Sequence, residues 1–244
     1  SAAGVQLSRL ETSDRFYRVT GTPMGLRTHP RFRDGSFSIQ GRGAGAIVEL
    51  LNPQPGETVL DVCAAPGTKT RYIAECLQGK GEIFASDISS ERIQIARQDD
   101  YRHSHPNVHW SVKDAQRDEF PPAEAILVDV PCSGTGVIGK HPDIKWRRKP
   151  GDIRKFHELQ IRILTHMLQF LKPGGRIVYA TCSLEKEENW DVVDAVLKLA
   201  KHFEVEPPGD QFPLRWREPG GALQTRPVRE PVDGLFGVLL RKKS

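Results

Sequence analysis

Long apolar runs are absent from this sequence. No hydrophobic stretch approaches the roughly 18–20 residues that a helix needs to span a bilayer. The amino end also lacks the charged and then apolar segment that is typical of a signal peptide. We therefore expect a cytoplasmic protein with no membrane partner.

Cysteine is sparse, with four residues at positions 63, 76, 132 and 182. No two of them form a C-x-x-C pair, so their spacing supports neither a zinc site nor a thioredoxin-like redox site. Three neighbouring histidines, His103, His105 and His109, have no acidic or thiol partner at matching spacing. We expect free thiols in a reducing compartment and no bound metal.

The 244 residues are enough for one large domain, or for one domain with an appendage. With 38% hydrophobic residues the chain can bury a full core. Its net charge of +4 is compatible with nucleic acid without being specific for it. We expect a monomer.

A strand, a tight loop and a helix follow one another early in the chain. Thr58–Val62 is a short apolar run, as in a strand buried on both faces of a parallel sheet. The small residues Ala64–Gly67 let a ligand approach the backbone, and Thr68–Leu77 predicts a helix whose free N–H groups face the loop. This arrangement predicts a pocket for a small polar cofactor at the carboxyl end of the first strand.

Two common phosphate-binding loops are excluded here. The dinucleotide fingerprint needs three glycines in G-x-G-x-x-G, and this loop has only Gly67. The phosphate loop needs Lys directly after Gly, but Thr68 separates Gly67 from Lys69. Asp61 near the end of the strand suits a ligand with an amino group. S-adenosylmethionine carries one, so the loop favours a methyltransferase.

Acidic residues also follow the next two predicted strands. Glu82–Asp87 ends in a carboxylate that can accept hydrogen bonds from two ribose hydroxyls. Val108–Val112 predicts another strand, and Asp114 just past it can accept the adenine amino group. Each acid alone could be a solvated loop residue, but three in a row favour a nucleoside cofactor.

From Thr58 onward strands alternate with helices, which predicts a parallel sheet with helices on both faces. The helices are predicted near 68–77, 89–104, 152–171 and 186–200. Further strands are predicted at Ala125–Asp129, Arg176–Thr181, Phe203–Glu206 and Asp233–Leu240, the last of them antiparallel. The expected fold class is α/β: a class I S-adenosylmethionine-dependent methyltransferase, with a Rossmann-like, mostly parallel sheet of seven strands.

We expect residues 1–40 to form a small amino-terminal appendage and residues 41–244 to form the catalytic domain. Short strands are predicted at Arg15–Thr20 and Gly25–Thr28, a helix at Ala44–Leu51, and a long loop over the site at Pro207–Pro231. Four arginines near the appendage either contact phosphate or carry solvated loop charge: Arg27, Arg31, Arg33 and Arg42.

Four motifs stand in order along the chain: Asp61–Thr70, Asp129–Gly136, His141–Trp146 and Ala180–Ser183. Together they resemble the Sun/Fmu/Nop family of RNA cytosine-5 methyltransferases, over about residues 38 to 240. The Pro-Cys pair of the second motif and the Thr-Cys-Ser triplet of the fourth are specific to that family. The chain departs from the family pattern at Thr68, where glycine is usual, and at Gly41–Gly45, where an acidic, serine-rich stretch is usual.

S-adenosylmethionine is therefore the expected cofactor. The loop and the acidic strand ends are expected to hold it, and the resemblance adds Arg92, which is otherwise a surface arginine. The expected cofactor-binding residues are Cys63, Ala64, Ala65, Pro66, Gly67, Thr68, Lys69, Asp87, Arg92, Asp114 and Asp129.

Methylation of cytosine at carbon 5 needs help, because carbon 5 is a poor nucleophile. A thiolate that adds to carbon 6 turns the ring into an enamine, and carbon 5 can then attack the sulfonium methyl. A base must next remove the carbon-5 proton so that the thiol leaves. At an unperturbed pKa near 8.5 only about 3% of a thiol is ionised at pH 7, so the site should lower that pKa. Asp129 can present a donor to N3 of the base.

Two cysteines compete for the role of nucleophile. Adjacent parallel strands would place both Cys132 and Cys182 beside the cofactor, and DNA cytosine-5 enzymes use a Pro-Cys, which would favour Cys132. The resemblance implies instead that Cys182 attacks, that Cys132 assists product release, and that Lys69 contacts the catalytic loop. The expected catalytic residues are Cys182, Cys132, Asp129 and Lys69.

The densest basic cluster is Lys145–Lys149 with Arg154 and Lys155, and it contains Trp146. It is either a charged helix start or a grip on RNA. Its place just after the Pro-Cys loop favours RNA, since cations hold phosphates and Trp can stack on a base. In helical RNA the target base must first be unstacked.

Ribosomal RNA is the expected partner and transfer RNA the alternative. The chain begins at Ser1 rather than Met, so the sequence leaves open whether a further RNA-binding domain precedes it. We expect the 244 residues alone to bind RNA with poor selectivity.

Two other functions stay open. A methyltransferase for small molecules or proteins would usually carry an Asn/Asp-Pro-Pro-Tyr/Phe loop where this chain has Asp129–Cys132. A non-catalytic RNA-binding scaffold would be expected to lack Cys182 or the acidic strand ends. Neither protein should form a covalent adduct with RNA.

Overall fold

The structure is a computed structural model that describes residues 5–10, 13–21, 25–228 and 231–243. Its central sheet is built from β3 (Thr58–Val62), β4 (Glu82–Asp87), β5 (Val108–Val112), β6 (Ala123–Asp129), β7 (Leu171–Thr181), β8 (Phe203–Glu206), β9 (Leu223–Thr225) and β10 (Leu235–Lys242).

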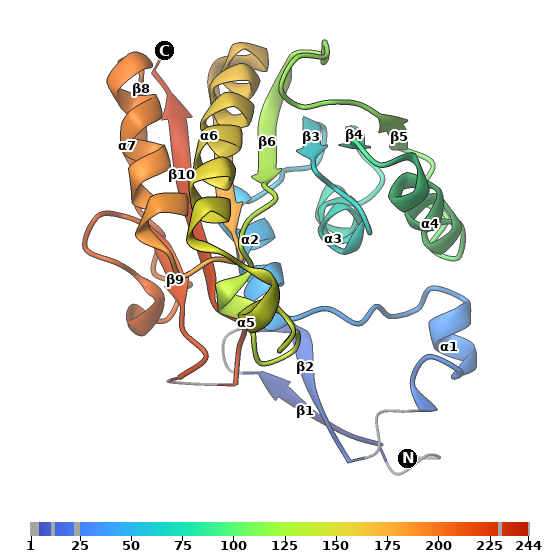
Figure 1. Cartoon of the computed structure of the whole chain (residues 1–244). Helices are drawn as coiled ribbons and strands as arrows, with labels where there is room; N and C mark the ends of the chain where they lie inside the picture. Colours follow the sequence, from blue (N-terminus) through green and yellow to red (C-terminus); the bar gives the residue numbers. More distant parts are fainter. Residues whose placement is uncertain (1–4, 11–12, 22–24, 229–230, 244) are drawn as a thin grey trace.

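Seven of these strands follow the order β5-β4-β3-β6-β7-β10-β8, and β9 pairs with β10 (Figure 1). Strands β3 to β7 run parallel to one another, whereas β10 is antiparallel to its neighbours. The predicted class I methyltransferase fold, with a mostly parallel sheet, is confirmed.

Helices cover both faces of the sheet, as Figure 1 shows. α2 (Arg42–Leu51) and α3 (Thr68–Leu77) pack on one face, and α6 (Pro150–Met167) and α7 (Trp190–Leu199) pack on the other. Because side chains alternate along a strand, Val59 of β3 lies in the first apolar layer and Leu60 in the second.

Several elements of the described chain differ from the sequence-based expectation. β9 forms within the predicted loop Pro207–Pro231, because Leu223–Thr225 finds an edge of β10 to pair with. The prediction of a strand at Gly25–Thr28 is wrong: this segment is a turn, in which the Thr28 hydroxyl donates to the Gly25 carbonyl at 3.0 Å. β1 (Val5–Leu10) was not predicted.

β1 and β2 (Ser13–Gly21) form a two-stranded antiparallel sheet apart from the central one. Phe16 of β2 packs edge-on against Tyr72 of α3, with ring centroids 5.5 Å apart. The same ring lies so close to Gly45 of α2 that a Cβ there would stand 2.3 Å from it. The division of the chain at residues 40 and 41 stays a prediction, and residues 1–4, 11–12 and 22–24 lie outside the described part.

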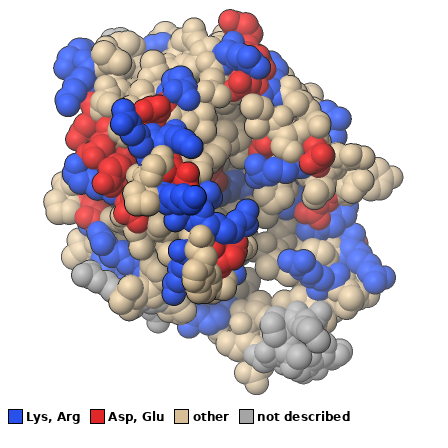
Figure 2. Space-filling model, viewed as in Figure 1, with Lys and Arg blue, Asp and Glu red and all other residues tan. Residues whose placement is uncertain are grey.

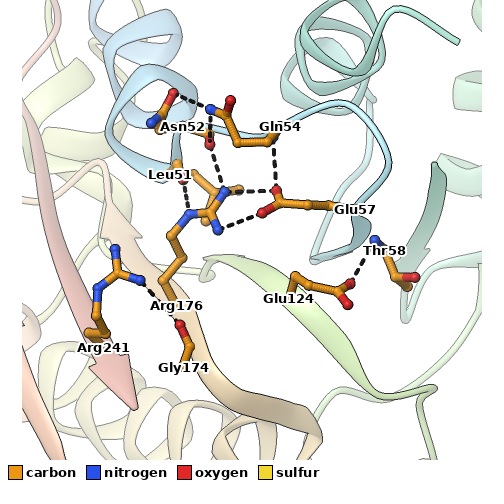
Figure 3. Close-up of polar contacts among 9 residues, drawn as sticks. All are labelled: Leu51, Asn52, Gln54, Glu57, Thr58, Glu124, Gly174, Arg176 and Arg241. Carbon is orange, nitrogen blue, oxygen red and sulfur yellow. Dashed lines mark hydrogen bonds and ion pairs between the residues drawn. The ribbon is translucent and has the colours of Figure 1, made fainter. Parts of the chain in front are cut away.

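A buried guanidinium joins β7 to α2 at the edge of the sheet where β3 begins (Figure 3). Arg176 forms two hydrogen bonds of 2.8 Å with the Glu57 carboxylate. It also donates to the carbonyls of Leu51 and Asn52, both at 2.6 Å. These bonds satisfy the end of α2 and fix its position on the sheet.

The carboxyl ends of the parallel strands lie together at the other end of the sheet, away from Arg176. The order of strands reverses between β3 and β6, which leaves a crevice at this point of a parallel α/β sheet. Lys69 lies in the first turn of α3, which follows β3, and the loops after β6 and β7 carry Cys132 and Cys182. The topology alone therefore brings these predicted site residues together.

Candidate active site

Two thiols face each other at the carboxyl ends of β6 and β7. The Sγ atoms of Cys132 and Cys182 are 3.0 Å apart, and the Cys182 backbone N–H also donates to Cys132 Sγ at 3.3 Å. Both cysteines are free. This juxtaposition of the two cysteines results from the direct pairing of β6 with β7.

The pKa values of the two thiols are shifted in opposite directions. The hydrogen bond from Cys132 lowers the pKa of Cys182, and the charge of Lys69 adds to this effect against burial and Asp129. The pKa of Cys132 is raised by the same hydrogen bond, by burial and by the charges of Cys182 and Glu188. Cys182 is therefore the more acidic thiol of the pair.

A cation and an anion bridge the crevice beside this pair. Lys69 Nζ lies 2.5 Å from Asp129 Oδ2, so α3 and the end of β6 are joined across the switch in strand order. Burial lowers the pKa of Lys69, but the charge and hydrogen bond of Asp129 outweigh burial and leave that pKa raised. Asp129 acts here as an acceptor, and its predicted donor role toward N3 would require it to take up a proton.

The predicted cofactor loop is tightly built. Gly67 has a φ of 93°, and a Cβ at this position would lie 2.7 Å from the Trp110 ring, so only glycine fits. The Ala65 N–H donates to Asp87 Oδ2 at 3.3 Å. Arg92 pairs with the same Asp87 oxygen at 3.0 Å and also donates to the Ala65 carbonyl. These contacts bring Asp87 and Arg92 to the loop, and their contact with the cofactor stays a prediction.

The other loop residues surround this turn. Ala64 and Ala65 are buried, Pro66 is exposed, and Thr68 begins α3. The Gly67 N–H donates to the Ala64 carbonyl at 2.8 Å. Burial and three nearby carboxylates raise the pKa of the Cys63 thiol, which disfavours its thiolate.

Asp114 lies just past β5 but is held by its own loop. Its Oδ1 accepts from the backbone and side-chain nitrogens of Gln116, at 3.0 and 3.1 Å. Its Oδ2 pairs with Arg117 at 3.2 Å. The contact of this carboxylate with adenine stays a prediction.

Asp61 lies beneath the loop, and its contact with the amino group of a ligand stays a prediction. Its side chain is buried, and Thr70 Oγ1 donates to Asp61 Oδ2 at 2.6 Å. Burial raises the pKa of this carboxyl to about 7 against the opposing effect of the Thr70 hydrogen bond. Asp61 therefore ties β3 to α3 beneath the loop. Strand periodicity could have signalled this, since Asp61 belongs to the run that is buried on both faces.

Basic side chains gather near α5 (Ile144–Arg147) and the start of α6, at the rim of a hollow (Figure 2). The exposed members of this basic cluster are Lys145, Arg147, Arg148, Lys149, Arg154 and Lys155. Trp146 among them is 79% exposed, as a base-stacking side chain would have to be. Of the four arginines near the appendage, Arg42 is turned inward onto Glu49 at 2.8 Å, so a phosphate contact by Arg42 is excluded.

The sequence did not reveal one residue of this region. Glu188 is fully buried and accepts hydrogen bonds from the two loops that carry Cys132 and Cys182. In the sequence it belongs to an acidic run before α7, Glu185 to Glu188, which resembles ordinary charge at a helix start. Only the path of the chain through space distinguishes it from its neighbours.

Among the described residues, no group of three or more His, Cys, Asp or Glu side chains is placed to hold a metal ion. The described helices are also too short or too polar to cross a membrane.

Comparison with known proteins places this site in a family. The model of the family described as 16S rRNA methyltransferase RsmB/F matches residues 48–241. A "Probable ribosomal RNA small subunit methyltransferase B" of Bacillus subtilis is 33% identical over 100% of this chain and 56% of its own length. The ribosomal RNA small subunit methyltransferase B of Serratia proteamaculans is 38% identical over 90% of this chain and 50% of its own.

Solved structures agree with these relatives. A methyltransferase homologue from Pyrococcus horikoshii superposes with a TM-score of 0.83 at 30% identity, over 98% of this chain and 79% of that one. NSun6 from the same organism, solved with SFG, gives a TM-score of 0.78 at 29% identity, over 90% of this chain and 56% of that one.

The chain spans about half the length of the curated relatives it matches. The matched part nevertheless includes the loops of both cysteines and the Lys69–Asp129 pair, so the predicted resemblance is confirmed. With identities of 33% and 38% along nine tenths or more of its residues, this chain belongs to the 16S rRNA methyltransferase RsmB/F family.

Proposed function

We propose that this chain transfers a methyl group from S-adenosylmethionine to carbon 5 of a cytosine in ribosomal RNA, through a covalent adduct with Cys182. The observation that carries the proposal is the pair of thiols 3.0 Å apart, with the pKa of Cys182 lowered and that of Cys132 raised. A binding module or a simple amine methyltransferase has no need for a thiolate beside a thiol.

The residues at the edge of the sheet fit the cofactor. The positive φ of Gly67 and its close packing against Trp110 fix the turn of the loop, and the buried Asp87 carboxylate is oriented by the N–H groups of Ala65 and Ser89. Asp87 would hold the ribose, and the 63–69 loop would hold the methionine end of the cofactor. Arg92, Asp114 and Asp129 would line the remainder of the cofactor site. When bound, S-adenosylmethionine supplies a methyl group on a sulfonium, which carbon 5 of the activated cytosine attacks. A related structure was solved with SFG, an analogue of this cofactor.

Cys182 would act first. Its thiolate adds to carbon 6 of the cytosine, and the electron pair of the double bond moves toward carbon 5 and the ring. The Lys69 ammonium is next to Asp129 and close enough to lower the pKa of Cys182, so it also offers positive charge to the ring as negative charge develops there.

Cys132 would act second. The negative charge of Cys182 helps to raise the pKa of Cys132 in the resting site. Once Cys182 is bonded to carbon, that charge is gone, so the Cys132 proton can pass to solvent. Cys132 can then take the carbon-5 proton, and the electron pair left on carbon 5 re-forms the double bond and expels the Cys182 thiolate.

Ribosomal RNA is proposed over transfer RNA because the named relatives act on the small ribosomal subunit. The basic cluster around α5 supports RNA as the substrate, since it lies beside the Cys132 loop and carries an exposed Trp.

The test is to trap the adduct. The chain is incubated with transcribed small-subunit rRNA and S-adenosylmethionine, and protein–RNA species are resolved on denaturing gels. Cys132→Ala should accumulate a covalent species, because addition and methyl transfer proceed while elimination is slow. Cys182→Ala should give neither turnover nor adduct, and the double variant should also lose the adduct.

Cys76→Ala is the matched control, because Cys76 contacts Arg15 and lies outside the site. It should behave as the unsubstituted chain. If Cys182→Ala traps RNA and Cys132→Ala does not, the two roles are reversed. If neither variant traps RNA and both remain fully active, thiol addition is excluded.

A further inference from the structure

The carboxylate of Glu188 is completely buried and carries four hydrogen bonds. Its Oε1 accepts from the Ser133 backbone N–H at 2.8 Å and from Gln160 Nε2 at 3.0 Å. Its Oε2 accepts from Ser183 Oγ at 2.7 Å and from Ser133 Oγ. Each oxygen of this carboxylate therefore accepts two hydrogen bonds.

The donors belong to the residues that follow the two reactive cysteines. Ser133 directly follows Cys132, and Ser183 directly follows Cys182. Gln160 of α6 also donates to the Pro131 carbonyl at 3.0 Å, so it holds the same loop from the other side. One carboxylate therefore ties together two loops that are 50 residues apart in the chain.

Glu188 also brings negative charge to one side of the thiol pair. Among the described residues, no salt bridge joins its carboxylate to Lys, Arg or His, so this charge is balanced only by hydrogen bonds. It contributes to the raised pKa of Cys132. Lys69, on the other side of the pair, contributes to the lowered pKa of Cys182. The two charges act in the same sense, because each favours the thiolate on Cys182.

We propose that Glu188 is a positioning residue that fixes the Cys132 loop against the Cys182 loop and keeps Cys132 the neutral member of the pair. This assignment rests on the proposed function for its biological meaning, but the ionisation of the two thiols can be measured without RNA or cofactor.

The experiment is alkylation of the complete chain with iodoacetamide between pH 5 and pH 10. Mass spectrometry of the peptides gives a rate for each cysteine at each pH. In the unsubstituted chain Cys182 should reach its half-maximal rate at a lower pH than Cys132. In Glu188→Gln the half-maximal pH of Cys132 should fall by about one unit, so the preference for Cys182 near pH 7 should shrink about tenfold.

Two variants serve as controls. Glu187→Gln makes the same chemical change one residue away on an exposed side chain, and it should leave both profiles unchanged. Glu188→Asp keeps the charge, and it should restore the separation of the two profiles at least in part. If Glu188 mattered only for folding, Glu188→Gln would not shift the pH profile of one thiol alone. Nor would Glu188→Asp, which supplies another carboxylate, restore the separation between the profiles of Cys132 and Cys182.

A third variant covers the case in which Glu188→Gln does not fold. Ser133→Ala removes one donor and leaves the carboxylate charged, so Cys182 should still ionise first, although the Cys132 loop loses a tether. The inference is overturned if both cysteines in the unsubstituted chain have the same profile. It is also overturned if Glu188→Gln folds with unchanged profiles, or if Ser133→Ala abolishes the order.

Methyl transfer supplies a second readout. In Glu188→Gln, kcat should fall about 10- to 100-fold while KM for the rRNA stays constant, because the thiols are disturbed and the basic cluster is not. If the chain alkylates as expected but never methylates rRNA, the proposed function fails and the role of Glu188 in the thiol pair stands.

Discussion

Asp61 holds a buried carboxyl group whose pKa of about 7 lies well above the ordinary value of 3.8. Burial is the main cause, because it penalises the charged form more than the Thr70 hydrogen bond favours it. The folded chain therefore binds this proton more tightly than the unfolded chain does. Its contribution to stability is complete below pH 3.8 and is lost as the pH rises through about 7.

We expect Asp61→Asn to remove this dependence. The free energy of unfolding of the variant, relative to the unsubstituted chain, should rise between pH 4 and pH 7 by up to about 4 kcal/mol, and it should level off above that. Urea unfolding at a series of pH values measures the difference. A difference that is constant from pH 4 to pH 8 would show that Asp61 is ionised in the folded protein.

Single residues also show which features of the site the sequence alone could not predict. Cys132 and Cys182 could both be placed beside the cofactor because each follows one of two adjacent strands. The opposite shifts of their pKa values arise first from the hydrogen bond between the two thiols and then from nearby charges such as Lys69 and Glu188, and Glu188 reaches the site only through the fold. The resemblance supplied the order of the two thiols that strand periodicity left open.

At the scale of elements, the loop after β6 and the start of β10 meet without room for a side chain. A Cβ on Gly136 would lie 2.1 Å from the Gly234 carbonyl oxygen and 2.9 Å from that of Cys182. The Gly136 N–H donates to the Cys182 carbonyl at 2.9 Å, and the Gly234 N–H donates to the Gly136 carbonyl at 2.8 Å. These bonds hold the backbone of the Cys182 loop.

Gly136→Ala should therefore force the loops apart. We expect a loss of about 1–3 kcal/mol in the free energy of unfolding and slower alkylation of Cys182 at pH 7. Gly139→Ala is the control, since a Cβ there meets nothing within 4 Å. Equal stability of the two variants would mean that the loop after β6 relaxes at no cost.

Elements whose own sequence carries a local pattern were predicted well, whereas elements that form only by pairing with another segment of the chain were not. α3 and β4 begin and end where their sequence patterns do. β9 has only three residues, and it forms because β10 offers an edge. Gly25–Thr28 has strand-like neighbours in the sequence, but it forms a local turn.

At the scale of the whole molecule, the exposed basic cluster should dominate RNA affinity through released counterions. We expect the triple variant Lys145→Gln, Lys149→Gln, Lys155→Gln to lower the slope of log affinity against log salt by about 2, at roughly 0.7 per phosphate contact on single strands. Filter binding of rRNA between 50 and 200 mM salt measures this slope.

The matched control changes three exposed lysines elsewhere: Lys80, Lys198 and Lys201. It has the same net charge as the first variant and should keep the original slope. If both variants lose the same slope, RNA is held by overall charge and not by the cluster around α5.

The sequence by itself determined the parallel α/β sheet, because apolar strand runs and amphipathic helices alternate along the chain and each pattern is local. It also determined that Lys69 and the loops of Cys132 and Cys182 lie at the same end of the sheet, since the carboxyl ends of parallel strands lie together. Tertiary structure alone decided that Arg42 turns onto Glu49 and that Glu188 reaches both cysteine loops. Burial and charge depend on neighbours that are distant in the chain, and no local pattern of residues encodes them.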